Sequence, residues 1–376
     1  MSHLTRIILV SFILILPVFA ANAYNKVFSV MTYNLENLFD THHDQGKNDY
    51  SFLPLYRKRN DPKIMNHCRS IPVPVFRSQC FNLDWNENVL LNKIRNLSEI
   101  ILTADNGRSP DILILQEVEN ANALRKLVDE GLHGEGYREL ILFEGPDQRG
   151  IDVAIISKFK LADDIRYHQI PVKDGYNNPK KARPTRGILE ATFKVNRKKI
   201  AVLANHWPSQ ANPNKTRMIA AQTLMKVVEG IKYPTIIAGD FNVENNDRLN
   251  PLRDYLLNQS NEHYFMDFEE SHYGSGFVSV PISTPRGTHF YRGKWNSLDR
   301  IMVPAWHLQG NCRLGRRKCL TPVWSSYAVI RNHRMTETIS YYEKGVLKRA
   351  KIPQRFNPET GKGASDHFAV LGRFIF

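Results

Sequence analysis

The stretch PTIIAGDFNVE, residues 234–244, decides the fold class. Thr235 to Ala238 form a short apolar run with β-branched residues, which is typical of a buried strand, and Gly239 ends the run. Asp240 and Asn242 follow, and residues two apart at a strand end point to the same side. We therefore expect a carboxylate and a carboxamide to project together from the C-terminal edge of a buried sheet. An ordinary Asx turn after a strand explains the same residues, so the rest of the chain must decide.

Strands and helices alternate along the rest of the chain, which indicates an α/β fold. Apolar runs predict strands at residues 27–33, 110–115, 151–157, 187–194, 199–205, 298–303 and 368–371. Helical spacing of apolar residues predicts helices at residues 85–104, 121–130 and 214–228. The segments 42–84 and 312–362 show neither pattern, and we expect both to be irregular.

Polar residues stand at the edges of these strands. They are Asn34, Glu117, His206, Asp240 with Asn242, and Asp366 with His367, while Asp299 and Asp152 lie within two further strands. Such a set is hard to explain as caps and turns alone, and it points to an active site. Because it extends from residue 34 to residue 367, we expect residues 24–376 to form one domain. Acids with amide oxygens suit Mg²⁺, whereas the few Cys and His at ligand spacing argue against zinc.

Residues 1–23 have the pattern of a secretory signal peptide. Arg6 gives a positive start, residues 7–19 are apolar, and Ala21-Asn22-Ala23 is a small-x-small cleavage site. The apolar run is short for a membrane span, and an uncleaved anchor is the alternative reading. We expect an exported protein, periplasmic or extracellular, that keeps no stable membrane span after cleavage. Nothing in the sequence sets its oligomeric state.

The chain is strongly basic, with 51 Lys+Arg against 37 Asp+Glu and a formal net charge of +14. An exported basic protein suits polyanionic partners, namely nucleic acid, acidic lipid or envelope polymers, and charge alone does not choose among them. Basic runs at residues 57–59, 180–186 and 313–318 are usually solvated surface, and here they also suit contacts with a phosphate backbone.

The four cysteines indicate disulfides in an exported chain. Pairing between sequence neighbours gives Cys68–Cys80 and Cys312–Cys319, which would close two small loops. Metal binding is the competing reading, and it is weaker because no CxxC motif occurs in the sequence.

Six short motifs occur in one order: TYN (32–34), QEVE (116–119), HWPS (206–209), GDFN (239–242), LDRI (298–301) and SDH (365–367). In this order the chain resembles the endonuclease/exonuclease/phosphatase family, most of all its secreted bacterial nucleases similar to deoxyribonuclease I. The resemblance spans nearly the whole mature chain. It implies a four-layer αββα sandwich, with two mixed β-sheets packed face to face and helices outside, and it implies metal-dependent hydrolysis of phosphodiesters.

The resemblance also assigns the metal and the water. Glu117 would be the principal Mg²⁺ ligand, with Asn34 and Asp366 near the metal or the phosphate. Mn²⁺ would be an alternative ion and Ca²⁺ an auxiliary one. Asp240 and Asn242 would position the nucleophilic water and stabilise the transition state.

Two histidines would share the proton transfers in this resemblance. His206 would act as general acid or base with Asp152 as its orienting carboxylate, and His367 would contact the phosphate with Asp299 orienting its ring. Each histidine alone would by default be a core residue with satisfied hydrogen bonds. Each of the two aspartates has a plain alternative, which is an ion pair with a neighbouring arginine.

One residue departs from the family pattern. Enzymes similar to deoxyribonuclease I carry an Arg two residues after the metal-binding Glu, and here that position is Glu119. The loss of this cation predicts weak sequence preference. The sequence therefore predicts an exported Mg²⁺-dependent nuclease of low specificity that acts on DNA or RNA.

Three alternatives stay open at this point. The first is a phosphoesterase for sphingomyelin or inositol phosphates, and its lipid-directed form would carry an exposed apolar hairpin that the sequence does not reveal. The second is a catalytically silent binding protein, and the third is a structural envelope protein that uses its basic surface alone.

Overall fold

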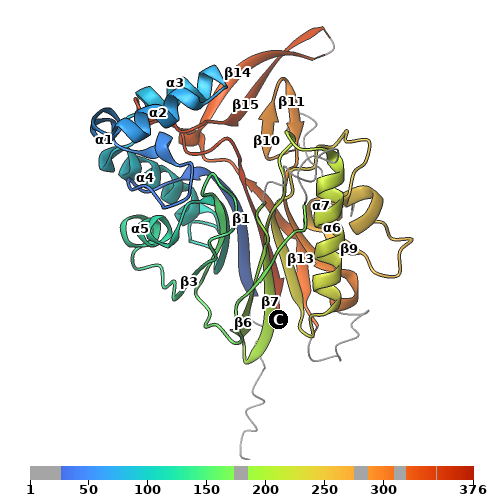
Figure 1. Ribbon diagram of the computed structural model, residues 1–376. Helices are drawn as coiled ribbons and strands as arrows, with labels where there is room; N and C mark the ends of the chain where they lie inside the picture. The colour runs from blue at the N-terminus through green and yellow to red at the C-terminus, as the bar shows by residue number, and fades with distance from the viewer. Residues whose placement is uncertain (1–26, 173–184, 275–286, 309–318, 344) are drawn as a thin grey trace, which may run out of the picture.

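The computed structural model describes residues 27–172, 185–274, 287–308, 319–343 and 345–376. Two six-stranded sheets form its centre (Figure 1). The first has the order β13-β16-β1-β2-β4-β3, and the second β5-β6-β7-β8-β12-β9. Both are mixed: β1 is parallel to β2 and antiparallel to β16, and β8 is parallel to β7 and antiparallel to β12.

The strands of the first sheet are β1 (Val27–Leu38), β2 (Ile112–Val118), β3 (Glu139–Leu142), β4 (Asp152–Ser157), β13 (Thr321–Ile330) and β16 (Ala369–Ile375). Those of the second are β5 (Arg166–His168), β6 (Ile188–Val195), β7 (Lys198–His206), β8 (Thr235–Asp240), β9 (Phe265–Asp267) and β12 (Asp299–Pro304). Two small ribbons pair β10 (His289–Tyr291) with β11 (Lys294–Asn296), and β14 (Thr336–Glu343) with β15 (Val346–Pro353).

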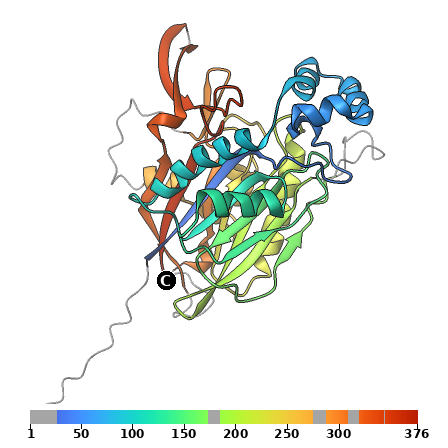
Figure 2. The ribbon, with the colours of Figure 1, turned by 90° about the vertical axis from the view of Figure 1, so that its left-hand side faces the viewer.

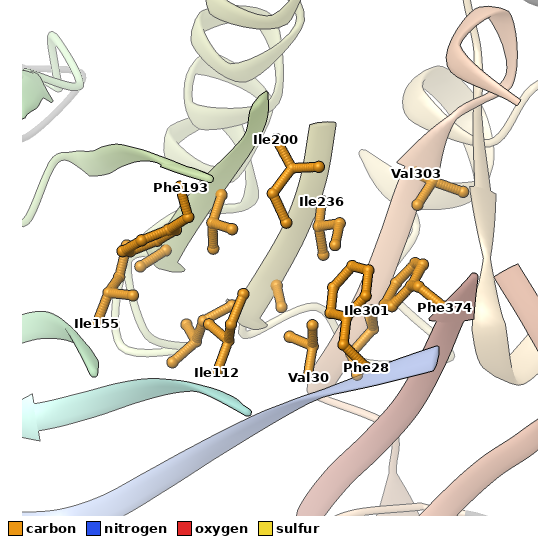
Figure 3. Packing of buried hydrophobic residues seen from close by; sticks show 14 of the residues in the cluster. Phe28, Val30, Ile112, Ile155, Phe193, Ile200, Ile236, Ile301, Val303 and Phe374 are labelled. Atoms are coloured by element: carbon orange, nitrogen blue, oxygen red, sulfur yellow. The ribbon is translucent and has the colours of Figure 1, made fainter. Parts of the chain in front are cut away.

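The two sheets pack face to face through one apolar core. Val30 and Ile155 of the first sheet and Phe193, Ile200 and Ile236 of the second belong to the same buried cluster, as Figure 3 shows. Helices α4 (Glu87–Thr103) and α5 (Ala121–Gly131) cover the outer face of the first sheet, and α6 (Asn214–Glu229) covers the second (Figure 2). The four-layer αββα sandwich expected from the sequence is confirmed.

Helices α4 and α5 begin where the sequence provides caps. Asn86 accepts a hydrogen bond from the Val89 amide at 3.2 Å at the start of α4, and Asn120 accepts one from the Ala123 amide at 2.8 Å at the start of α5. Further short elements are η3 (Leu252–Leu256), α7 (Phe268–Gly274), η4 (Ala305–His307) and η6 (His333–Met335). Among the described residues, no helix is long and apolar enough to cross a membrane.

The prediction of irregular structure at residues 42–84 was wrong. The segment forms η1 (Tyr50–Phe52), α1 (Leu55–Asn60), α2 (Pro62–Ser70) and α3 (Pro74–Asn82). Two of the prolines that made it look irregular, Pro62 and Pro74, stand at the first position of α2 and of α3, where a missing amide hydrogen costs nothing. The predicted disulfide Cys68–Cys80 joins α2 to α3, whereas the pairing of Cys319 with Cys312 involves a residue outside the described ones.

The segment 312–362 was also expected to be irregular, and this was wrong as well. It contains the edge strand β13 and the ribbon β14–β15, which projects from the sheets at the top of Figure 1. The sequence pattern failed for a physical reason: the ribbon is largely exposed, so it lacks the apolar alternation of a half-buried strand. In β13 the pairing with β16 shifts between Val323 and Ala328, which interrupts the alternation there.

Candidate functional site

The strand ends meet around the carboxylate of Asp240. The side-chain amides of Asn34 and Asn242 donate to its Oδ2 atom, at 3.1 Å and 3.2 Å. The same oxygen lies 3.6 Å from Nε2 of His206 and 4.0 Å from Nε2 of His367. The stretch that opened the sequence argument therefore forms the centre of the site, with one histidine on each side of its carboxylate.

The remaining predicted residues connect to this centre, with one exception. Glu117 Oε1 lies 3.9 Å from His206 Nε2, and Asp366 Oδ1 lies 3.9 Å from His367 Nε2. Asp299 accepts a hydrogen bond from Nδ1 of His367 at 2.7 Å. Among the described residues, only Asp152 has no such connection.

Gly239 sets the position of Asp240. Its φ angle is 150°, and a Cβ atom there would lie 1.9 Å from the carbonyl oxygen of Asn205 on β7. Only glycine fits this approach of the two strands. The result is a parallel register in which His206 lies directly beside Asp240.

The backbone is strained where the site residues lie. Glu36, Asn37, Glu117 and Asn242 have positive φ angles of 50°, 62°, 62° and 51°, which are uncommon for residues other than glycine. Glu117 also sits in a bulge, because the pairing of β2 shifts on both of its sides. A bulge re-aims a side chain, and here the Asn37 amide donates to Glu117 Oε2 at 3.1 Å. Such outliers cluster at functional sites.

His367 is held in the charged form. Burial by itself would lower its pKa, but the charge and hydrogen bond of Asp299, followed by the charges of Asp366 and Asp240, outweigh burial and hold the pKa well above its ordinary value. The alternative reading of Asp299 does not apply, since Arg300 makes its ion pairs with Asp267 at 3.2 Å and Glu269 at 3.4 Å.

His206 is held in the neutral form. Its pKa lies well below the ordinary value because of burial first and the nearby charges of Arg186 and Arg149 second. Its Nδ1 atom is buried and has no hydrogen-bond partner within the described chain. The two histidines of the site, which are both buried, thus prefer opposite charge states.

Asp152 does not reach His206. Its Oδ1 atom accepts a hydrogen bond from the Gly145 amide at 2.9 Å, its Oδ2 atom is buried without a partner, and the described contacts of His206 do not include it. Burial raises the pKa of Asp152 to about 7. The alternative ion pair with Arg149 is also absent from the described contacts, because Arg149 pairs with Asp147 at 3.3 Å.

Glu117, Asp366 and Asn34 offer hard oxygen donors of the kind that a divalent cation takes. Glu117 forms no ion pair with a lysine or arginine in the part of the chain that the structure describes, and its Oε1 atom faces His206. Nearby Glu36 adds a further carboxylate, whose Oε2 atom is buried without a hydrogen-bond partner. An orphaned carboxylate oxygen among carboxylate and amide oxygens is the donor set that Mg²⁺ prefers. Burial raises the pKa of Glu36 to about 7.

Sequence reasoning missed two basic groups of the site. Arg355 pairs with both Glu36 and Asp366 at 2.6 Å, and it went unnoticed because residues 312–362 were expected to be a loop. His289 on β10 lies with its ring centroid 4.7 Å from that of His367, and burial and the charge of His367 lower its pKa to about 4. Nothing in the sequence around His289 signalled this position.

Glu119 and the basic runs, the residues that bear on contact with a polyanion, are partly buried and partly exposed. Glu119 is 2% exposed and its Oε2 atom accepts a hydrogen bond from the Asp40 amide at 2.7 Å, so it is turned inward. Within the first basic run Lys58 is buried and donates to two backbone carbonyls, which leaves Arg57 and Arg59 exposed. The run 313–318 lies outside the described residues, as does most of the run 180–186.

The ribbon β14–β15 supplies the exposed hairpin that the sequence did not reveal. Tyr342, Val346 and Leu347 near its end are 72%, 59% and 58% exposed. Lys348 and Arg349 follow on β15 and are exposed too. The ribbon, the β10–β11 hairpin and α1–α3 all lie at the same end of the sheets in Figure 1.

Comparisons with known proteins agree with this architecture. A family model described as "Endonuclease/Exonuclease/phosphatase family" matches residues 77–374. No curated protein sequence matches the chain.

Several solved structures are similar to it. One is the human nocturnin catalytic domain with bound sulfate anion, with 17% identity, coverage of 93% of this chain and 95% of that one, and a TM-score of 0.49. Another is a mannosyl-6-phosphatase from Bacteroides thetaiotaomicron, with 14% identity, 93% and 100% coverage, and a TM-score of 0.48. A third is TDP2 from D. rerio in complex with a single-strand DNA product, with 14% identity, coverage of 93% of this chain and 99% of that one, and a TM-score of 0.48. Nothing about the substrate follows from likenesses at this level.

Proposed function

The chain belongs to the endonuclease/exonuclease/phosphatase family, and from that premise we propose that it is an exported, Mg²⁺-dependent phosphodiesterase, a nuclease of low sequence specificity. Family membership makes it a metal-dependent hydrolase of phosphate esters. The observation that carries the finer proposal is the pair of buried histidines on either side of Asp240, one neutral and one charged.

The two histidines suit two different roles in one hydrolysis, one as proton acceptor and one as hydrogen-bond donor. Neutral His206 can take a proton at Nε2, the atom that faces Asp240 and Glu117. Charged His367 can donate a hydrogen bond from Nε2 to a phosphate oxygen while Asp299 holds its other nitrogen. General acid and base groups with separated pKa values are what such a reaction needs near neutral pH. Asp240, fixed by two carboxamides, would hold the attacking water between them.

Glu117, Asn34 and Asp366 would hold the metal. When bound, a divalent ion would polarise the phosphate and offset the charge that develops on it. We propose Mg²⁺ for this role because the donors are hard oxygens, with Mn²⁺ able to replace it. Arg355, which pairs with Asp366 in the structure, would have to share that carboxylate with the ion.

The proposal of a nucleic acid substrate rests on the six ordered motifs, which most resemble those of secreted nucleases, and the net charge is compatible with it. The chain carries a formal net charge of +14, and a polyanion with many phosphates is the partner that such a charge favours. Low sequence specificity follows from Glu119, since its buried side chain offers no base-reading contact. Export rests on residues 1–23 alone.

A second candidate is a phosphodiesterase for a membrane lipid such as sphingomyelin. The observation that favours it is the exposed end of the ribbon β14–β15, where Tyr342, Val346 and Leu347 neighbour basic residues. Apolar and aromatic side chains with adjacent cations suit the boundary between lipid head groups and acyl chains. The nuclease remains the first proposal because the six ordered motifs most resemble those of secreted nucleases.

One assay separates the two candidates. Purified mature protein is incubated with plasmid DNA, RNA, sphingomyelin vesicles and inositol phosphates, in Mg²⁺ and in EDTA. We expect DNA to be cut in Mg²⁺, with or without cleavage of RNA, and neither nucleic acid to be cut in EDTA. A His367→Ala protein purified in the same way controls for contaminating nuclease. Cleavage of sphingomyelin alone would transfer the proposal to the lipid, and no turnover of any ester would contradict both.

A further inference from the structure

A second group of acids lies behind the catalytic centre, at the base of helices α1–α3. Asp44, Asp49 and Glu119 each offer one carboxylate oxygen, and these oxygens lie within 4.8 Å of one another. Asp40 adjoins them, because its amide donates to Glu119 Oε2 at 2.7 Å. None of these residues belongs to the Asp240-centred site, and no role in the proposed hydrolysis uses them.

The group holds an orphaned oxygen. Glu119 is 2% exposed, and while Oε2 accepts the Asp40 amide, Oε1 is buried with no hydrogen-bond partner. A buried carboxylate oxygen without a donor is costly, and native structures satisfy such atoms with a proton, a water or an ion. One carboxylate oxygen each of Asp44 and Asp49 lies within 4.8 Å of a Glu119 carboxylate oxygen, so three acidic groups gather beside this buried side chain.

The surroundings supply little positive charge. Within the described part of the chain, Asp40, Asp44, Asp49 and Glu119 form no ion pair with a lysine or arginine. Two histidines are their neighbours: His43 bonds to Asp49 through Nδ1, and His42 lies 3.8 Å from Asp40. The other donors are neutral, such as the Asn120 amide that reaches Asp44 at 2.9 Å.

We propose that Asp44, Asp49 and Glu119 bind an auxiliary, non-catalytic divalent cation of the Ca²⁺ class. Three carboxylates are hard, oxygen-only ligands, and Ca²⁺ takes oxygens at 2.3–2.6 Å in flexible geometry with waters completing the shell. Oxygens on opposite sides of such an ion are about 4.8 Å apart, and the three oxygens of the group lie within 4.8 Å of one another, close enough to share one ion. Asp44 is only half-buried, so an ion has a route in.

The site would couple two parts of the fold. Asp44 and Asp49 belong to the loop after β1 that leads into the disulfide-bonded helices, while Glu119 follows the end of β2, two residues after Glu117. His43 stacks on Tyr50, and Tyr50 contacts His67 of α2. An ion held here therefore ties the helical segment α1–α3 to the strand that carries Glu117.

The test removes the catalytic metal site and leaves the second one. Mature Glu117→Gln protein is stripped with EDTA and titrated with Ca²⁺ alone by calorimetry, with thermal unfolding followed in parallel. We expect one saturable site and a rise in Tm of roughly 3–6 °C at a 100-fold excess over Kd. Adding Glu119→Gln should abolish both the Ca²⁺ binding and the rise in Tm. Adding Asp44→Asn, a milder change at a half-exposed residue, should do the same. Adding Glu229→Gln, which removes an exposed carboxylate on α6, should leave both in place.

Two results would overturn the proposal. One is the absence of saturable Ca²⁺ binding in folded Glu117→Gln protein, which would mean that Glu119 and its neighbours share a proton instead. The other is unchanged binding after Asp44→Asn and after Glu119→Gln, which would place the ion elsewhere. Neither result depends on whether the chain cuts nucleic acid, because the readout is binding and Tm.

Discussion

His206 and His367 are both buried, and each places Nε2 within about 4 Å of the same carboxylate oxygen of Asp240, yet they prefer opposite charge states. Burial lowers the pKa of both rings. For His367 a carboxylate at 2.7 Å reverses that effect, whereas for His206 two arginines reinforce it. The comparison teaches that the neighbours of a buried histidine, more than its depth, decide whether it can act as acid or as base.

The largest effect should come from the acid that lies beside His206. Glu117→Gln keeps the shape of the side chain but removes the charge that would hold the metal. Loss of about 6 kcal/mol of transition-state stabilisation corresponds to a fall in kcat of more than about 10⁴-fold. Thermal unfolding should change little, which separates this loss from misfolding. Wild-type turnover in excess EDTA would contradict the metal-dependent reading.

Removal of either histidine should cost less than removal of the metal ligand. His206→Ala and His367→Ala should each lower kcat by about 10²–10⁴-fold, the range of general acid–base groups. His307→Gln is the matched control, because His307 is also buried but lies outside the site. Full turnover by either alanine variant would return that histidine to the role of an ordinary core residue.

Asp299→Asn should move one arm of the pH–rate profile and not the other. The change removes the charge that raises the pKa of His367, so the pKa falls and the alkaline arm of kcat/KM moves to lower pH, by roughly 1–3 units. The acidic arm, set by His206, should stay in place. Asp152→Asn should leave both arms unchanged; an acidic arm that moved would show that Asp152 orients His206 in solution after all.

Most of the fold and the central residues could be predicted from the sequence. The motifs around Asp240 and His367 lie at the ends of the buried strands β8 and β16, and there the apolar runs and the polar strand ends are both visible in the chain. Asp299 was correctly paired with His367. These successes share a cause, which is that burial on both faces forces a strong sequence pattern.

The failures also have physical causes. Arg355 and the ribbon β14–β15 lie in exposed segments, where tertiary contacts rather than periodicity fix the backbone. The bulge at Glu117 and the inward turn of Glu119 follow from a register shift that alternation cannot predict. Asp152 lies on the expected strand, but the contacts of its side chain depend on the Gly145 backbone, which no motif marks.

The smallest effect on catalysis should come from the disulfide between α2 and α3. Cys68 and Cys80 are 12 residues apart in the sequence, and their disulfide closes the loop between them. Replacing both by serine opens this loop and should lower the free energy of unfolding by about 3 kcal/mol. Both arms of the pH–rate profile should keep their positions, because neither histidine touches these helices. Denaturant unfolding and the pH–rate profile of the double variant check the two halves of this prediction.

The central claim is that at the same pH His206 is neutral while His367 is positively charged, and imidazole NMR tests it most directly. Mature protein labelled with ¹⁵N in its histidines is titrated from pH 5 to pH 9 in EDTA, with His206→Ala and His367→Ala providing the assignments. At pH 7 we expect His367 to show two protonated ring nitrogens and His206 to show one. Rings that titrate together near their ordinary pKa of about 6.5, or in the reverse order, would contradict the account.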